Sequence, residues 1–268
     1  MTCKTGSSIW LWASLILVLA LSGCNALSID KSIASGGHDS RVRLVILHYT
    51  SVDFDQSIYL LTQTGVSSHY LIGDQPAKIY QLVPEHRRAW HAGDSSWHGR
   101  TWLNSSSIGI ELVYPGYLLM NGQQYWPQWS EQQIDLLVRL LKDIVARHEL
   151  PKDSIVGHAD VSPQRKIDPG PMFPWSSLAN AGLISWPKPE HMELFQPIYA
   201  QQLPDAHWFQ QKLQLLGYQI EPSGVIDEQT QNVLKVVWMK YGSHDLQAMS
   251  MAQLAAIIQS LVVQQVHN

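Results

Sequence analysis

The sequence predicts an α/β domain built around a buried sheet, followed by a small C-terminal three-helix domain. Strand-like apolar runs recur between residues 41 and 113, and an amphipathic helical pattern follows from residue 130. After residue 205 the apolar spacing is helical throughout, which predicts the second domain. The chain has 268 residues and is 45% hydrophobic, enough for one sizeable core and a small second domain.

The strand assignments rest on short apolar segments. Arg41–Tyr49 is apolar on both faces, which predicts a central strand covered on both sides. Ser68–Ile72 and Lys78–Val83 are predicted strands separated by a turn at Gly73–Asp74. Ile108–Val113 reads as another buried strand.

One long helix is predicted to follow the strands. Ser130 and Gln133 form a capping-box pattern at its start, and Pro151 ends it. The apolar residues between them recur at helical spacing: Ile134, Leu137, Val138 and Leu141. Together these elements place the α/β domain at residues 41–185.

The remainder of the chain divides into a connector and a tail. Four prolines within residues 186–204 predict a stiff, extended linker. Residues 205–268 predict three helices: the first stops at Gly217, Asp227 caps the second and Ser250 caps the third. Because three helices of this size are marginally stable alone, we expect them to lean on the larger domain.

The N-terminus has the pattern of an export signal. Lys4 precedes an apolar run, Ile9–Leu21, that is too short to span a bilayer as a helix. Leu21–Cys24 resembles a bacterial lipobox, which predicts a signal peptide over residues 1–23, lipidation at Cys24 and a tether over residues 24–40. The alternative is a plain signal peptide that ends in cysteine. By resemblance to enterobacterial lipoproteins, Asn25 favours the outer membrane, facing the periplasm.

Composition narrows the range of partners. The formal net charge is −4 and no basic stripe is visible, which excludes a nucleic-acid partner. The 11 Trp and 10 Tyr suit carbohydrate faces, and they equally suit ordinary cores.

Three residues are candidate metal ligands. His48 ends an apolar strand, His158 follows a short apolar strand and a glycine, and Asp168 precedes Pro-Gly. Each has a plainer alternative: a hydrogen-bonded core histidine for either imidazole, a turn former for the carboxylate. Together, two neutral imidazoles and a carboxylate make a tridentate zinc site of the catalytic type. Spacing alone does not select these two from the 12 histidines of the chain.

What selects them is a set of six short motifs in a fixed order. They are His48–Thr50 (HYT), Ser67–Ile72 (SSHYLI), Trp90–Gly93 (WHAG), Ser107–Leu112 (SIGIEL), Gly157–Asp160 (GHAD) and Lys166–Gly170 (KIDPG). Residues 40–180 thereby resemble the zinc-dependent type-2 N-acetylmuramoyl-L-alanine amidase family, which includes peptidoglycan-recognition proteins. The resemblance implies a mixed β-sheet flanked by helices. It also implies hydrolysis of the amide between N-acetylmuramic acid and L-alanine of peptidoglycan, in cell-wall turnover.

The resemblance assigns roles to particular residues. It implies one Zn²⁺ per chain on His48, His158 and Asp168, an acid–base carboxylate at Glu111 and an assisting cation at Lys166. Glu111 is the one charge in its strand and shares a face with Gly109, whose missing side chain leaves room for a substrate cleft. Four residues within the motifs are expected to line that cleft or to pack around it: Tyr49, His69, Trp90 and His91.

The tail carries a second resemblance. Leu213–Tyr218 and Gly224–Asp227 are similar to the small helical peptidoglycan-binding domain, although Val236–Trp238 replaces its usual Phe-Gln pair. Binding to an insoluble polymer would raise the local enzyme concentration; the alternative is a structural buttress.

Three other functions compete with the amidase. A non-catalytic peptidoglycan-recognition lipoprotein would keep the fold without the complete ligand set. A zinc endopeptidase would need a local histidine–aspartate signature. A structural periplasmic lipoprotein would leave the WHAG and KIDPG motifs unexplained. We expect a membrane-anchored monomer acting on peptidoglycan or muropeptides.

Overall fold

The fold is centred on a five-stranded sheet with the strand order β3-β2-β6-β1-β9. The strands are β1 (Leu44–Tyr49), β2 (Tyr70–Ile72), β3 (Ile79–Gln81), β6 (Ser107–Leu112) and β9 (Ile155–Gly157). β1 runs parallel to β6 and β9, β2 runs parallel to β6, and β3 is antiparallel to β2. The expected mixed sheet with flanking helices is therefore confirmed.

The computed structural model describes residues 27–243 and 245–266. The predicted signal peptide and Cys24 lie outside these residues, and residues 27–40 contain no helix or strand. Among the described residues, no helix combines the length and apolar character needed to cross a bilayer.

Side chains of β1 alternate between two cores, as the two-residue period of a strand requires. Val45 and Leu47 pack with helix α3 (Glu131–His148) and helix α5 (Trp175–Asn180). Leu44 and Ile46 face the other way and share a core with the C-terminal helices. The prediction that this strand is covered on both sides is confirmed, and the C-terminal segment supplies part of the cover.

Helix α3 begins after Ser130, but the predicted capping box does not form. The Ser130 side chain makes no capping hydrogen bond. Gln133 is buried instead, and its side-chain amide donates to the carbonyls of Ile72 and Val113, both at 3.0 Å. The prediction was wrong because the Gln133 side chain points to the Ile72 and Val113 carbonyls and so does not reach back to the backbone of Ser130.

The predicted extended linker is also wrong, because helix α6 (Pro189–Gln201) occupies most of residues 186–204. Pro189 stands in the first turn, where a missing N–H costs nothing, and only Pro197 lies inside the helix. Helix α6 packs along α9 (Met251–Val266), and its Met192 and Tyr199 contact the shared core. Tertiary packing on α9 therefore overrides the local tendency of the prolines.

The three predicted tail helices form as α7 (Ala206–Leu215), α8 (Glu228–Tyr241) and α9. The Asp227 side chain caps α8 by accepting from the Thr230 N–H at 2.8 Å. Phe209, Val237 and Leu254 share one core with the sheet residues Leu44 and Ile46. The C-terminal helices therefore pack against the sheet, as expected for so small a helical unit.

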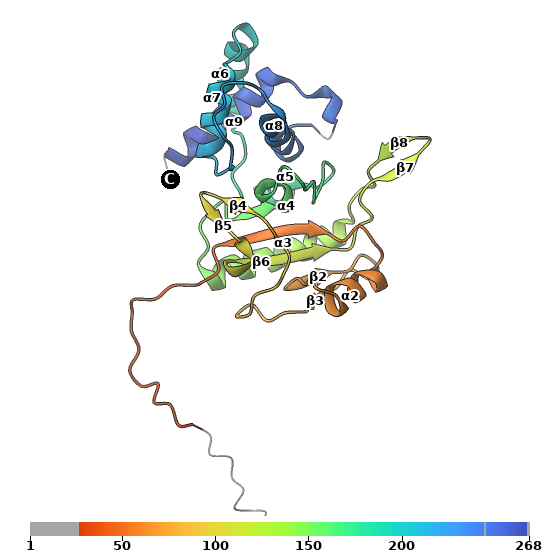
Figure 1. Cartoon of the computed structure of the whole chain (residues 1–268), viewed down its shortest axis with the longest axis vertical. Helices are drawn as coiled ribbons and strands as arrows, with labels where there is room; N and C mark the ends of the chain where they lie inside the picture. Colours follow the sequence, from red (N-terminus) through yellow and green to blue (C-terminus); the bar gives the residue numbers. More distant parts are fainter. Residues whose placement is uncertain (1–26, 244, 267–268) are drawn as a thin grey trace, which may run out of the picture. The chain divides into compact units, whose positions relative to one another are not determined.

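Figure 1 shows α4 (His158–Val161) and α5 between the sheet and the helices α6 to α9. Several short elements carry no clear signal in the sequence and were not predicted. They are α2 (Phe54–Gln63), β4 (Ser96–Trp97), β5 (Arg100–Thr101), η1 (Leu103–Ser105), β7 (Leu118–Met120), β8 (Gln123–Tyr125), α4 (His158–Val161), α5 and η2 (Leu246–Ala248).

Candidate active site

Strand register places His48 beside Glu111. The two residues are partners in the parallel β1–β6 ladder, so their side chains project from the same face of the sheet. His48 is 2% exposed and lies one residue before the end of β1. A polar ring so deeply buried requires polar partners.

His158 and Asp168 reach the same place from the other side. His158 is the first residue of α4, directly after β9. The Ala159 N–H donates to the Asp168 carbonyl at 2.9 Å, which ties the two backbone segments together. Both side chains are buried among the residues around His48.

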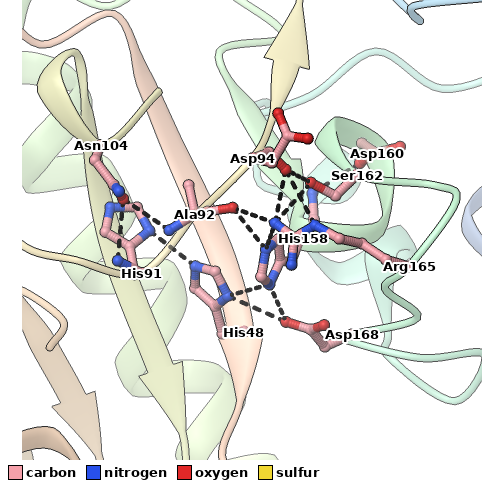
Figure 2. Close-up of polar contacts among 11 residues, drawn as sticks. His48, His91, Ala92, Asp94, Asn104, His158, Asp160, Ser162, Arg165 and Asp168 are labelled. Atoms are coloured by element: carbon pink, nitrogen blue, oxygen red, sulfur yellow. Dashed lines mark hydrogen bonds and ion pairs between the residues drawn. The ribbon is translucent and has the colours of Figure 1, made fainter. Parts of the chain in front are cut away.

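Three potential ligand atoms converge at this point (Figure 2). His48 Nδ1 lies 3.0 Å from His158 Nδ1 and 3.1 Å from Asp168 Oδ2. His158 Nδ1 lies 3.0 Å from the same carboxylate oxygen. Residues separated by up to 120 positions in the chain thus form one compact triangle.

Hydrogen bonding fixes the tautomer of His158. Its Nε2 lies 3.1 Å from the Ala92 carbonyl oxygen, which can only accept. Nε2 therefore carries the proton in the neutral ring, and Nδ1 keeps a lone pair that faces His48 and Asp168.

A chain of hydrogen bonds fixes the tautomer of His48 in the same sense. Ser107 Oγ donates to the Leu103 carbonyl at 2.7 Å, so it accepts from His91 Nε2 at 3.2 Å. His91 Nδ1 is then an acceptor, and His48 Nε2 donates to it at 3.0 Å. His48 Nδ1 is left unprotonated, facing the other two ligand atoms.

The triangle therefore consists of three acceptors with no donor among them, an arrangement that a cation stabilises. Zn²⁺ binds imidazole nitrogen and carboxylate oxygen at about 2.0–2.2 Å, which sets tetrahedral ligand atoms about 3.3–3.6 Å apart. The observed separations of 3.0–3.1 Å need only a slight expansion. The residues present fit a divalent metal with three protein ligands.

Electrostatics keep the three converging atoms in forms that can bind a metal. Burial, assisted by His158, lowers the pKa of His48 to about 4, so its ring is neutral at neutral pH. Burial alone would raise the pKa of Asp168, but its close contacts with the His158 and His48 rings bring it well below its ordinary value. Asp168 is therefore an anion in the folded protein.

Glu111 stands out because one oxygen of its carboxylate lacks a hydrogen-bond partner among the described residues. Its Oε2 atom is buried and makes no hydrogen bond within the described part of the chain. Burial raises the pKa of Glu111 to about 8; Asp168 raises it further, and Lys166 opposes the rise. A carboxylate tuned in this way can exchange a proton near neutral pH.

These groups line a cleft of about 370 Å³. Lys166 is exposed at the cleft and is close enough to His48 and Glu111 to lower the pKa of both. Tyr49 and Trp90, two of the expected substrate-lining residues, also line it. The Trp90 side chain is 51% exposed, which leaves its ring available for contact.

His69 does not line this cleft; its ring lies 5.7 Å from the ring of His91, so it packs around the site, which is the second of the two roles expected for it. It is fully buried, with Nδ1 accepting from the Gly109 N–H at 3.0 Å and Nε2 donating to the Arg87 carbonyl at 3.1 Å. Since both ring nitrogens bond to the backbone, His69 joins β2 to β6 and offers no polar atom to a substrate.

Gly109 also differs from expectation. A Cβ atom at this position would overlap the His91 ring, so the space that the glycine leaves is filled by His91 and not by a substrate. His91 lines the cleft, but both of its nitrogens are committed to His48 and Ser107. Its geometry is that of a residue that orients a metal ligand.

Two residues that support the site were missed at the sequence level. Asn104 Oδ1 accepts from the backbone N–H groups of His91 and Ala92 at 3.0 and 2.7 Å. Arg165 Nη2 donates to the carbonyls of Ala92 and Asp94 at 2.6 and 2.7 Å (Figure 2). The only sequence signal for Arg165 is that it precedes Lys166.

Comparison with known proteins agrees with this geometry. A family model described as N-acetylmuramoyl-L-alanine amidase matches residues 38–171. The chain is 37% identical to the N-acetylmuramoyl-L-alanine amidase AmiD of Escherichia coli K12 over 238 residues, which cover 84% of this chain and 86% of that protein. The chain belongs to the N-acetylmuramoyl-L-alanine amidase family. It is an enzyme that hydrolyses the amide between N-acetylmuramic acid and L-alanine.

Solved structures of amidases share the fold over nearly the whole chain. E. coli AmiD in complex with anhydro-N-acetylmuramic acid-L-Ala-D-γ-Glu-L-Lys superposes with a TM-score of 0.79 at 34% identity, covering 91% of this amidase and 97% of AmiD. AmpDh3 of Pseudomonas aeruginosa gives a TM-score of 0.81 at 31% identity, covering 89% and 99% of the two chains. The similarity extends through the C-terminal helices.

Proposed function

We propose that this amidase binds one Zn²⁺ through His48, His158 and Asp168 and uses it to release stem peptides from peptidoglycan or its soluble fragments. The observation that carries the proposal is the convergence of three unprotonated acceptors beside Glu111, whose Oε2 atom is buried and makes no hydrogen bond among the described residues. A metal site that keeps a position open beside a proton acceptor is typical of hydrolases.

Zinc in such a site supplies Lewis-acid chemistry, polarising a carbonyl and making water more acidic. Glu111 is the general base and then the general acid, because its raised pKa allows proton uptake and release near neutral pH. Lys166 stabilises the negative charge that develops on the amide oxygen, a contribution of about 3 kcal/mol for one well-placed donor.

The substrate proposal follows from the AmiD complex, whose ligand is an anhydromuramyl peptide. We assign Trp90 and Tyr49 to substrate contact because both line the cleft. Aromatic rings with an exposed face suit the apolar face of a sugar. The C-terminal helices remain a proposed peptidoglycan-binding module.

For location, we propose a lipoprotein of the outer membrane that faces the periplasm, anchored by acyl chains on Cys24. Support comes from the Leu21–Cys24 lipobox and from Asn25 after it. Each buried methylene of an acyl chain contributes about 0.8 kcal/mol to membrane binding. Replacing Cys24 with serine should move the protein from the membrane fraction to the soluble fraction; unchanged membrane association would contradict the anchor.

The direct test of function is digestion of purified muropeptides by protein lacking residues 1–24. Mass spectrometry should detect the free sugar and an intact stem peptide, and a chelator should stop their release. Products cleaved within the peptide would indicate an endopeptidase. Binding without products would indicate a recognition protein.

The ligand assignment has its own test. His48→Ala should lose both zinc and activity, since two remaining ligands hold the ion poorly. Zinc content is measured on the purified, folded variant, with His38→Ala, in the exposed segment before the sheet, as control. Stoichiometric zinc in His48→Ala would disprove the assignment.

A further inference from the structure

The turn that carries His158 is held by a buried carboxylate, Asp160. Its Oδ2 accepts from the Gly157 N–H at 2.7 Å, closing the turn around His158. The Ala159 N–H inside this turn donates to the Asp168 carbonyl. The position of Asp160 therefore affects the backbones of two of the three proposed ligands.

Two residues of the C-terminal helical segment donate hydrogen bonds to the Asp160 carboxylate. Tyr218 donates its hydroxyl to Asp160 Oδ1 at 2.7 Å, and Lys240 Nζ donates to Oδ2 at 2.8 Å. Tyr218 follows α7, and Lys240 lies in the last turn of α8. With the Gly157 N–H, these donors give Asp160 three hydrogen bonds.

The three side chains of this hydrogen-bonded cluster are almost completely shielded from solvent. Asp160 is 1% exposed, Tyr218 5% and Lys240 6%. The Trp175 ring centroid lies 4.4 Å from Lys240 Nζ, a cation–π distance. Burial lowers the pKa of Lys240, but the Asp160 carboxylate more than offsets this, so the pKa is raised and the ammonium stays charged.

A buried ion pair is an inefficient way to join two segments. Its desolvation cost offsets most of the attraction, and apolar residues of similar size stabilise such an interface equally well or better. The core shared between the sheet and the C-terminal helices already supplies apolar contact. What Lys240 and Tyr218 add is direction, because hydrogen bonds fix the carboxylate of Asp160 in one orientation.

We propose that Lys240 and Tyr218 are positioning residues of the metal site, acting through Asp160 on the turn that presents His158. The C-terminal helices are then part of the metal-binding scaffold as well as a proposed wall-binding module. This inference rests on the proposed zinc ligands and adds to them a requirement for the docked tail.

The test is the zinc dissociation constant of the folded, full-length mature protein, measured by chelator competition. Lys240→Met should weaken zinc binding on the order of ten-fold, at the lower end of the effect of removing a supporting hydrogen bond. Tyr218→Phe removes one hydroxyl and should weaken binding about five-fold. Asn232→Ala is the matched control: it lies on α8 and bonds to Gln164 at 2.9 Å, away from Asp160.

A second readout separates positioning from stability. In cobalt-substituted protein, the visible absorption of the metal should change in Lys240→Met and Tyr218→Phe but not in Asn232→Ala. If Lys240→Met does not fold, Tyr218→Phe decides. The inference is overturned if both variants lose thermal stability yet bind zinc within about two-fold of Asn232→Ala. Failure of the wild type to bind zinc would instead disprove the proposed function.

Discussion

Replacing Glu111 with glutamine tests the electrostatics of the site without changing its shape. Relative to its ordinary value of 4.5, the pKa of Glu111 is raised to about 8, chiefly by burial. At about 1.4 kcal/mol per pH unit, ionising this carboxyl in the folded, metal-free protein costs up to about 5 kcal/mol. Glutamine cannot ionise, so Glu111→Gln avoids this cost.

The sign follows from proton linkage. Between pH 4.5 and about 8 the folded protein keeps the Glu111 proton that the unfolded chain has lost. Stability of the wild type therefore falls as pH rises through this window. Glu111 is partly exposed, so solvent reduces the cost of ionising it. We therefore expect the free energy of unfolding of Glu111→Gln to rise by about 3 kcal/mol relative to wild type between about pH 5 and 8.

The assay is urea unfolding of both proteins with a chelator present, at several pH values. Other titrating groups occur in both proteins and cancel in the difference. Glu131→Gln, at the exposed start of α3, controls for the chemical change. Zinc should reduce the pH dependence, since a nearby cation favours the ionised carboxylate. A stability difference that is flat from pH 5 to 8 would refute the reasoning. With zinc bound, turnover of Glu111→Gln should fall on the order of 10²–10⁴-fold.

Three further predictions concern the metal and the packing around it. Gly109→Ala should displace the His91 ring, lowering the unfolding free energy by about 1–3 kcal/mol and weakening zinc binding; unchanged zinc affinity in a competition assay would contradict this. When free zinc is present at about 1,000 times its dissociation constant, removing it should lower the free energy of unfolding by about 4 kcal/mol. An unchanged melting temperature in calorimetry would contradict this. Gln133→Leu should cost about 1–3 kcal/mol in urea unfolding, because the Val113 carbonyl loses its donor and the Ile72 carbonyl keeps only the Val113 N–H. A neutral result would contradict this and would mean that water replaces the amide.

The local pattern of apolar residues was sufficient to predict those elements whose structure is determined by burial of one or both faces. The strand at Arg41–Tyr49 and the helix from Ser130 follow from apolar periodicity, which depends on near neighbours in the chain. The same logic failed at residues 186–204, where four prolines suggested an extended linker. There the deciding contact is the packing of α6 on α9, more than fifty residues further along the chain, which no local pattern records.

By itself, the sequence determined the strands of the sheet, the long helix, the three tail helices and the motifs that carry the family resemblance. Those motifs contain the histidine, aspartate, glutamate and lysine side chains of the candidate site, and these side-chain types limit the chemistry that the site can perform. Tertiary structure alone decided that His91 orients His48, that His69 lies outside the cleft, and that Asp160 is gripped from the C-terminal helices. The reason is physical: hydrogen-bond partners are chosen by position in space, and here they lie 18 to 80 residues apart in the chain.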